Sequence, residues 1–242
     1  IETIETQNPL AAPHAADRFT TRVPKLAWRM SWRLIGWWPG LITLALLACI
    51  LIFIPVPDRA RAVEIVAPLL IGIHAALLFA PDDEPALELL LAAPRPLIWL
   101  LIERLAVLFL LHLPIVIAGW LLLVINHPNL YFAVDPLRWI APTILLTGVA
   151  LYITQLNRRS SFGVLVVIAV YGPMLFGGDL LVTEYPFLWP VHLFLWPGFE
   201  TPDLLITDAL YLANRLIISL IGLGLLAVVL QRLRDTEKVL GI

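Results

Sequence analysis

Long apolar runs, separated by short polar or proline-rich breaks, dominate the chain. The runs are about 20 residues long, which is the length that an α-helix needs to cross the hydrocarbon core of a bilayer. The pattern predicts an all-α integral membrane protein with a six-span transmembrane domain over residues 36–230. The expected spans cover residues 36–57, 63–80, 97–125, 137–156, 162–182 and 208–230.

The composition agrees with this prediction. Of the 242 residues, 60% are hydrophobic and 14% are charged, whereas soluble domains are on average about half apolar and about a quarter charged. The net charge of -2 gives no basis for a nucleic-acid partner, and the single cysteine, Cys49, excludes a disulfide within this sequence. Residues 1–19 lack the basic-then-apolar order of a signal peptide and are expected to form a flexible tail.

A stripe of basic residues precedes the first span. Its members recur three or four residues apart and therefore share one face of a helix, while apolar residues occupy the opposite face. Tryptophans flank the boundary between the two faces. The pattern predicts an amphipathic helix over residues 20–35 that lies in the anionic headgroup layer, with a solvated juxtamembrane segment as the alternative. The basic residues are Arg22, Lys25, Arg29 and Arg33.

Arginine and lysine residues fall mainly on one side of the predicted spans. Only Arg59, Arg61 and Arg138 lie on the other side, and the last segment there, residues 179–208, carries five acids and no arginine or lysine. By the positive-inside rule, the basic side is the cytoplasm. The protein is therefore expected in the inner (plasma) membrane of the cell. Both of its termini, including the tail at 231–242, are expected on the cytoplasmic side.

The loop between the second and third spans is short and begins with acids. Three acids at positions 82–84 precede Pro85, which places negative groups at the positive end of a helix dipole. Pro94 and Pro96 then end the helix, because proline cannot continue the hydrogen-bonded ladder. The sequence predicts a short amphipathic helix that lies on the cytoplasmic face of the membrane.

The residues of this loop follow a recognisable order. An acidic residue, a Leu-Glu pair, a Leu-Leu pair and Ala-Pro are followed by a new membrane helix, and this order resembles the first cytoplasmic loop of type-2 ABC exporter permeases. The chain departs from the family where Pro85-Ala86 replaces Gly-Thr and where Glu103-Arg104 replaces Gly-Lys. The matching residues are Glu84, Leu87, Glu88, Leu90, Leu91, Ala93 and Pro94.

The resemblance implies the permease subunit of an ATP-driven exporter. In such a protein this loop is a coupling helix that docks on a separate ABC ATPase, and two permease subunits, as a homo- or heterodimer, form the translocation path among the membrane lipids. The residues expected to couple the permease to the ATPase are Asp82, Asp83, Glu84, Leu87, Glu88, Leu91 and Arg95, with Arg158 and Arg159 in the second cytoplasmic loop.

Motifs for nucleotide, metal or nucleophile chemistry do not occur in the sequence. Its two lysines, Lys25 and Lys238, do not follow a glycine-rich loop, so ATP and magnesium are expected in the partner ATPase. H-E-x-x-H, C-x-x-C and G-x-S-x-G are also missing, so we expect no metal site in this chain and a transport subunit that is not itself an enzyme. The sequence does not distinguish among lipids, glycans, peptides and drugs as the transported substrate.

His74, His112 and Arg215 form a possible polar site inside the predicted spans, where such side chains are costly and often functional. At equal depth, His74 and His112 could ligate a haem, which would make the chain a non-transporting membrane anchor or a haem-bearing subunit of a larger complex. Alternatively, each histidine hydrogen-bonds to a neighbouring helix or faces a polar cavity. Arg215 is expected to reach the interface, to pair with Asp208 or Glu184, or to contact substrate.

The segment between the fifth and sixth spans is aromatic and interrupted by four prolines. Successive prolines are about two turns apart, so neither half can cross a core of about 30 Å, yet the segment is too apolar for a solvated loop. The pattern predicts a re-entrant helical hairpin within residues 184–208 that protects Leu188 and Leu195. An aromatic belt lying flat in the interface is the alternative.

Overall fold

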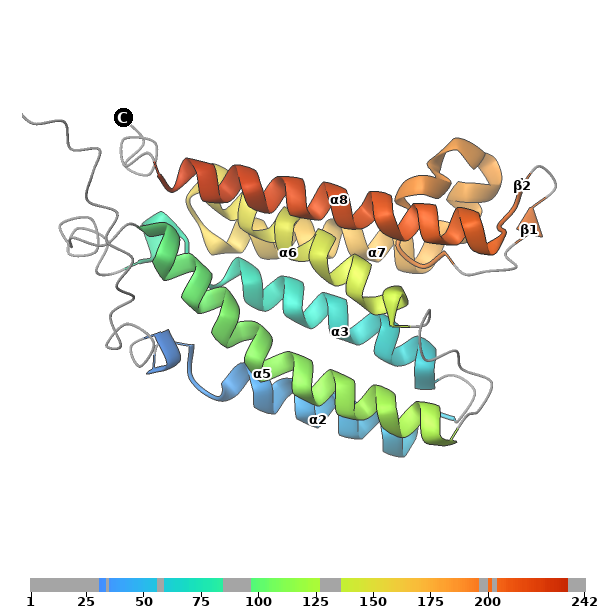
Figure 1. The fold of residues 1–242 in the computed structure, drawn as a ribbon, viewed down its shortest axis with the longest axis horizontal. Coiled ribbons are helices and arrows are strands. Elements are labelled where there is room, and N and C mark those ends of the chain that lie inside the picture. Colours follow the sequence, from blue (N-terminus) through green and yellow to red (C-terminus); the bar gives the residue numbers. More distant parts are fainter. Residues whose placement is uncertain are drawn as a thin grey trace, which may run out of the picture.

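The computed structural model describes residues 31–33, 35–55, 59–84, 97–126, 136–195, 200–201 and 204–234. Within these residues the protein is almost entirely helical, which confirms the all-α class (Figure 1). The long helices are α2 (Trp38–Phe53), α3 (Arg59–Ala76), α5 (Leu97–Asn126), α6 (Leu137–Asn157), α7 (Ser160–Glu184) and α8 (Asp208–Arg232). They are joined by two 3-10 helices, η3 (Pro81–Asp83) and η4 (Pro186–Val191), and by an antiparallel pair of two-residue strands, β1 (Glu200–Thr201) and β2 (Leu204–Leu205).

Four of the described helices are long and apolar enough to cross a membrane. The qualifying stretches lie in α5, α6, α7 and α8, whereas α2 is apolar but only 16 residues long. The outer faces of these helices expose large hydrophobic side chains, such as Phe176 at 89% and Ile125 at 76%. Apolar surface of this extent marks a face that contacts lipid. The chain is therefore a multi-pass membrane protein.

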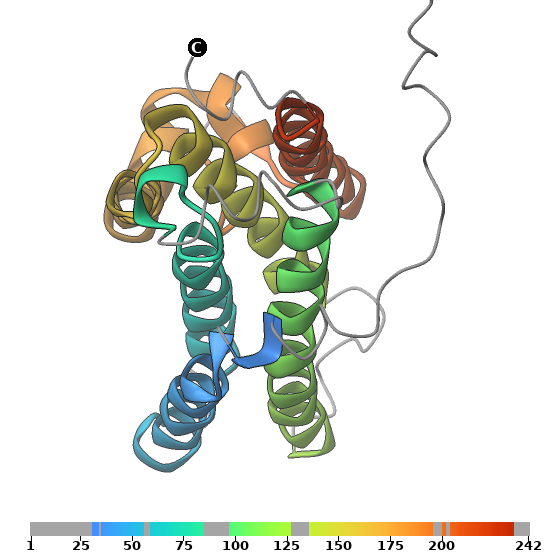
Figure 2. The same ribbon diagram turned by 90° about the vertical axis from the view of Figure 1, so that its left-hand side faces the viewer.

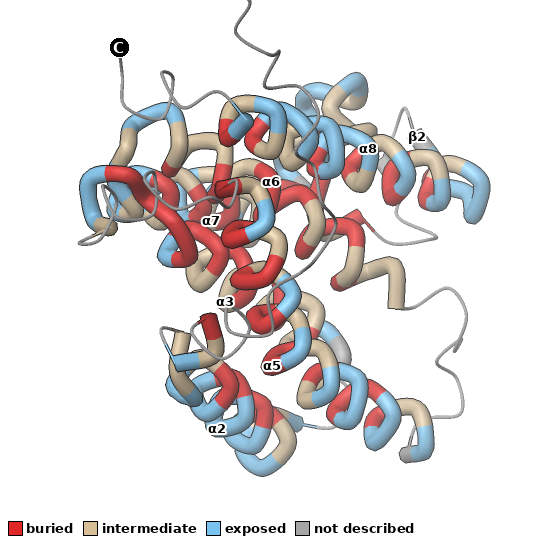
Figure 3. The backbone as a smooth tube through the Cα atoms, turned by 60° about the vertical axis from the view of Figure 1, so that its left-hand side comes forward, coloured by how far each residue is buried: buried red, intermediate tan, exposed pale blue. Residues whose placement is uncertain are grey.

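α6 lies at the centre of the helix bundle. It packs most extensively against α8 and α3 and also contacts α7, while α2 packs against α5 and α3 (Figures 1 and 2). As a result, α6 is buried along most of its length, and α2 is exposed on its outer face (Figure 3). An apolar groove of about 570 Å³ remains between α5 and α6, lined by residues that include Trp120 and Trp139.

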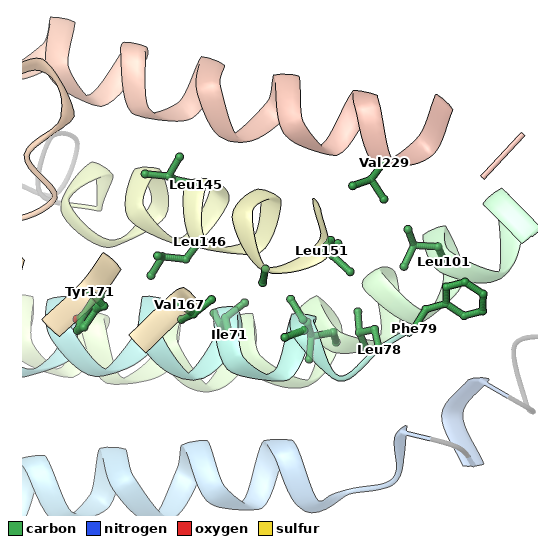
Figure 4. Packing of buried hydrophobic residues seen from close by; sticks show 14 of the residues in the cluster. Ile71, Leu78, Phe79, Leu101, Leu145, Leu146, Leu151, Val167, Tyr171 and Val229 are labelled. Atoms are coloured by element: carbon green, nitrogen blue, oxygen red, sulfur yellow. The ribbon is translucent and has the colours of Figure 1, made fainter. Parts of the chain in front are cut away.

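The main hydrophobic core joins five helices through one continuous cluster of side chains. Ile71 of α3, Leu146 of α6 and Val167 of α7 are fully buried side by side, and the fully buried Leu101 of α5 lies farther along the same cluster (Figure 4). Ile218 extends the same cluster to α8. A second cluster joins α2 to α3, α5 and α6, and it includes Leu47, Val63, Trp120 and Trp139.

α3 occupies a different stretch from the one expected. It runs from Arg59 to Ala76, whereas the predicted span covers residues 63–80. Its carboxyl end is capped by side chains of other helices: Gln155 of α6 donates to the Phe79 carbonyl at 2.8 Å, and Arg104 of α5 donates to the Leu78 carbonyl at 2.6 Å. Hydropathy does not register such tertiary caps, so the apolar run suggested a later end.

The other helix bounds lie close to the predicted ones. α5, α6, α7 and α8 begin and end within two residues of the expected spans, and α2 begins two residues later and ends four residues earlier than expected. Other predictions fall outside the described residues. These are the tails at 1–19 and 235–242, the amphipathic helix at 20–30 and the connector at 85–96.

The backbones of α6 and α8 touch at two glycines, which leads to a first prediction. A Cβ atom added at Gly222 would lie 2.6 Å from the carbonyl oxygen of Ile144, and one added at Gly148 would collide with the Gly222 carbonyl. Gly222→Ala is expected to destabilise the bundle by about 1–3 kcal/mol, because overpacking forces the backbones apart. Thermal unfolding of the detergent-solubilised chain measures this loss.

Gly224 supplies a matched control on the same helix. A Cβ atom added there meets nothing within 4 Å. Gly224→Ala is therefore expected to leave the unfolding temperature unchanged or to raise it, because alanine is preferred over glycine in a helix interior by about 0.5–1 kcal/mol. Equal unfolding temperatures for the Gly222→Ala and Gly224→Ala variants would contradict the close approach of α6 and α8.

Candidate functional site

The acidic start of the connector folds back onto the turn between α6 and α7. In η3, the backbone N–H of Asp82 donates to the carbonyl of Arg158 at 2.9 Å. The guanidinium of Arg158 completes the contact, because its Nε donates to Asp82 Oδ1 at 2.8 Å. Arg159 lies 3.8 Å from the other carboxylate oxygen. The structure therefore brings the first predicted cytoplasmic loop and the second into direct contact.

Backbone geometry contributes to this contact as well as charge. Arg158 ends α6 with a φ of 65°, and it is the only residue other than glycine with a positive φ among the described ones. That conformation is uncommon for a residue with a Cβ, and here it accompanies a carbonyl bonded to Asp82. The side chains of Arg158 and Asp82 are 32% and 38% exposed. An ion pair so exposed contributes only about 0.2–1 kcal/mol.

Asp83 caps the first turn of α7 from a distant part of the chain. Its Oδ2 accepts hydrogen bonds from the backbone N–H of Ser160 at 2.8 Å and from the Ser160 hydroxyl at 2.5 Å. A carboxylate at this position is also favoured by the positive end of the helix dipole. The two hydrogen bonds from Ser160 lower the pKa of the Asp83 carboxyl below its ordinary value.

Glu84 is held by α5. The Nη1 atom of Arg104 donates to Glu84 Oε2 at 2.7 Å as well as to the Leu78 carbonyl. Only 5% of the Arg104 side chain and 11% of the Glu84 side chain are exposed. Removing one partner of such a buried pair leaves the other charge without compensation, which costs about 3–5 kcal/mol. One carboxylate oxygen of Glu84 therefore serves the internal structure.

The predicted coupling residues divide into two groups. Asp82, Asp83 and Glu84 lie together with Arg158 and Arg159 at the same end of the bundle, which is also the end where α8 finishes (Figure 1). The other predicted members lie outside the described residues. These are Leu87, Glu88, Leu91 and Arg95, and the further motif residues Leu90, Ala93 and Pro94.

The two histidines of the predicted spans, His74 and His112, bond to each other. His74 Nδ1 lies 2.8 Å from His112 Nε2, and the ring centroids are 5.0 Å apart. His112 Nδ1 lies 2.8 Å from the carbonyl oxygen of Leu108. In this geometry the rings are in direct contact, so a porphyrin does not fit between them. The arrangement corresponds to the alternative in which the histidines bond to neighbouring helices.

Arg215 bonds to backbone carbonyls, which were not among its expected partners. It is 3% exposed, and its Nη1 and Nη2 atoms donate to the carbonyls of Leu193 and Leu195 at 2.7 and 2.5 Å. Its guanidinium also lies over the ring of Tyr211. The expected pairing with Asp208 or Glu184 is therefore wrong. The backbone after η4 leaves carbonyls without helical partners, and a buried arginine satisfies two of them.

The segment predicted as a re-entrant hairpin is compact in its described part. It contains one short 3-10 helix, η4, followed by a turn. A regular α-helix, which would form the first arm of the predicted hairpin, does not occur in this described part. Leu195 is 2% exposed, whereas Leu188 is only half-buried. Asn214 of α8 donates to the carbonyls of Trp189 and His192. The segment is thus packed against α8 through its backbone, and its depth in the membrane stays a prediction.

Sequence reasoning missed some polar contacts. Arg138 of α6 donates to Glu64 of α3 at 3.0 Å, at the opposite end of the bundle from Asp82. Glu64 was hidden because it lay near the expected start of a span, and its partner is 74 residues away. The role of Arg104 was equally hidden, because hydropathy places it at an interface. Only the helix register brings such pairs together.

The described polar side chains therefore gather mainly at the two ends of the bundle. One group holds the entry to the connector, and the other holds η4 and its turn against α8. No protein-family model, curated protein or solved structure matches this chain. The residues and their geometry therefore carry the functional argument.

A second prediction concerns the charge of Asp83. Because its pKa is lowered in the folded chain, its carboxylate contributes stability above the ordinary pKa of about 4, and the contribution is lost as the pH falls through the lowered value. Asp83→Asn is expected to lower the unfolding temperature by about 1–3 °C near neutral pH. Unfolding curves from about pH 7 to about pH 3 should show this gap narrowing once the pH falls below about 4.

Glu184→Gln, at the far end of α7, removes a carboxylate of the same charge and supplies the background for this titration. A gap between the wild type and the Asp83→Asn variant that persists unchanged at the lowest pH would mean that the charge of Asp83 does not stabilise the cap on Ser160.

A third prediction tests the anchor provided by Arg215. In a Cys49→Ala background, a maleimide should label Phe187→Cys quickly and Leu195→Cys slowly, since these side chains are 73% and 2% exposed. Adding Arg215→Met should raise the labelling of Leu195→Cys by about tenfold or more, because each carbonyl left unsatisfied costs about 1–3 kcal/mol. Labelling of Phe187→Cys is the control. Slow labelling of Leu195→Cys in both backgrounds would refute the anchor.

Proposed function

We propose that the chain is the permease subunit of an ATP-driven ABC exporter of the type-2 class. Two such subunits would form the translocation path, and each would couple to a separate ATPase through the connector at 82–95. The proposal is supported by the order of residues in the connector, by the multi-pass membrane fold and by the distribution of basic residues.

The proposal includes six membrane spans with both termini in the cytoplasm. α2 is about 24 Å long, from its 16 residues at 1.5 Å each, so it needs the apolar residues that flank it to cross a core of about 30 Å. Trp37 and Trp38 at its start suit the membrane interface. α3 would be the second span, with Arg59 and Glu64 at its outer end.

The observation that supports coupling most directly is the way the connector entry is held. Asp82 and Asp83 bond to the α6–α7 turn, and Glu84 bonds to Arg104 of α5. The entry also continues directly from the end of α3. A displacement of the connector would therefore act on four helices at once. That is the property that a coupling segment needs if ATP-driven movement of a docked ATPase is to rearrange the spans.

The second candidate function is a non-transporting membrane anchor or a haem-bearing subunit. The contact between His74 and His112 argues against a haem held between these two rings. A structural anchor has no requirement for a connector entry tied to four helices. An absorbance spectrum of the purified protein gives a direct test of the haem version.

A fourth prediction tests the coupling role. Glu88→Lys reverses a charge at the centre of the connector and is expected to abolish co-purification with the ATPase, or to lower ATP hydrolysis of the complex by about tenfold or more. Glu84 is left unchanged in this test, because its bond to Arg104 makes its substitution a structural change as well. The measurement is ATP hydrolysis by the reconstituted complex, with membrane insertion checked in parallel.

Glu184→Lys is the matched control, since it makes the same charge reversal at the other end of α7. It is expected to leave association with the ATPase unchanged. Unaltered association of the Glu88→Lys variant, or an equal loss in both variants, would contradict the proposed coupling.

A further inference from the structure

A cavity of about 300 Å³ lies beside the entry to the connector. Its walls come from the residues around Ile35 and Pro39, the end of α3, the first turns of α5 and Ser160. This volume lies at the lower end of the range of small-molecule sites, which is about 300–1,000 Å³. Its polar lining residues are His74, Asp83, Glu84, Arg104 and Ser160.

The contacts of the histidine pair determine which ring nitrogen of His74, a residue that lines this cavity, is left for a further hydrogen bond. His112 is fully buried, and its Nδ1 contacts the Leu108 carbonyl, which can only accept, so this nitrogen carries the proton. Buried between a carbonyl and another imidazole, the ring of His112 is neutral, and its Nε2 accepts from His74 Nδ1–H. Because burial also disfavours a charge on His74, its ring is neutral with the proton on Nδ1, and its Nε2 is unprotonated. This Nε2 atom can therefore accept a hydrogen bond from a ligand in the cavity.

The other polar groups of the cavity also leave mainly acceptors. Ser160 occupies one oxygen of Asp83, and Arg104 occupies one oxygen of Glu84, so each carboxylate keeps a second oxygen. The Nη1 atom of Arg104 is already bonded to Glu84 and to the Leu78 carbonyl, so the donor that Arg104 leaves buried without a partner is its Nε. Two carboxylates and one guanidinium give the lining a net negative charge. A ligand that fits this chemistry is a cation that donates hydrogen bonds.

The remaining walls are apolar. Ile35, Leu77 and Leu108 line the cavity together with Phe79. The guanidinium of Arg104 lies 5.7 Å from the centroid of the Phe79 ring, so this aromatic face already has a cation. A quaternary ammonium group, which is recognised by aromatic faces, is therefore a poorer fit than a group with N–H donors.

We propose that this cavity binds an organic ammonium ion with an apolar body. An N–H group of the ligand donates to His74 Nε2, its charge faces Asp83 and Glu84, and its apolar body contacts Leu77 and Leu108. The site belongs to this chain alone and does not depend on the proposed transport function. Binding is therefore measured without an ATPase, and failure of either proposal leaves the other standing.

A fifth prediction tests this site with four short probes. Binding of hexylammonium, hexyltrimethylammonium, hexanol and hexyl sulfate to the full chain in phosphatidylcholine nanodiscs is measured by calorimetry, with empty nanodiscs subtracted. Hexylammonium is expected to bind about tenfold tighter than the other three, because only it combines a positive charge with N–H donors. Equal affinity for hexyltrimethylammonium would overturn the role of His74, and tighter binding of hexyl sulfate or hexanol would overturn the proposal.

Substitutions locate the binding in the cavity. His74→Phe keeps an aromatic ring but removes the acceptor, and it is expected to weaken hexylammonium binding about tenfold. Asn157→Ala, at the same end of the bundle but outside the cavity lining, should bind like the wild type. Unchanged binding by the His74→Phe variant, or an equal loss in the Asn157→Ala variant, would refute the site.

A measurement on the unaltered chain covers the case in which His74→Phe does not fold. A hexylammonium analogue that carries a diazirine on its alkyl chain is cross-linked to the wild type, and the labelled peptides are identified by mass spectrometry. Labels near Leu77 and Leu108 that excess hexylammonium removes would support the site. Competed labels confined to other helices would overturn it.

Discussion

Where a helix ends within a membrane protein, its last backbone carbonyls lose their helical hydrogen bonds and must accept from other donors, because lipid offers none. This constraint organises both ends of the bundle. Where α3 stops, Arg104 and Gln155 donate to the freed carbonyls, and in the turn after η4 Arg215 and Asn214 do the same. The polar side chains that look out of place in apolar helices are therefore what allows the chain to turn. They also place the connector entry and the η4 segment.

The sequence was sufficient for α5 to α8, because a run of apolar residues of membrane length has few other solutions. It was insufficient wherever a distant side chain decides the outcome. The end of α3 depends on Gln155, which is distant in the sequence. The partners of Arg215 are backbone carbonyls, and since every residue has one, the sequence does not indicate which of them Arg215 contacts. His74 and His112 bond to neighbouring helices, which was one of the two alternatives for them. Which atoms are in contact depends on helix register and could not be predicted. Acidic residues were anticipated at the connector; their bonds to Ser160 and Arg104 were not.

The entry to the connector and the cavity beside it share residues. Asp83 and Glu84 both line the cavity. Asp83 also bonds to Ser160 at the α6–α7 turn, and Glu84 also bonds to Arg104 of α5. A ligand that draws on these carboxylates must therefore compete with, or add to, the hydrogen bonds that hold the entry. Occupancy of the cavity and the position of the connector are linked in this way, since a group that stabilises one arrangement of shared residues changes its equilibrium with the others.

The contact between Gly148 and Gly222 limits how the bundle can move. Because backbone meets backbone there, α6 and α8 have no layer of side chains that could repack to alter their spacing. α5, in contrast, is separated from α6 by an apolar groove. Any rearrangement of the bundle is therefore expected to move α6 and α8 as one rigid pair, and the helix spacing that has room to change is the one across the apolar groove between α5 and α6.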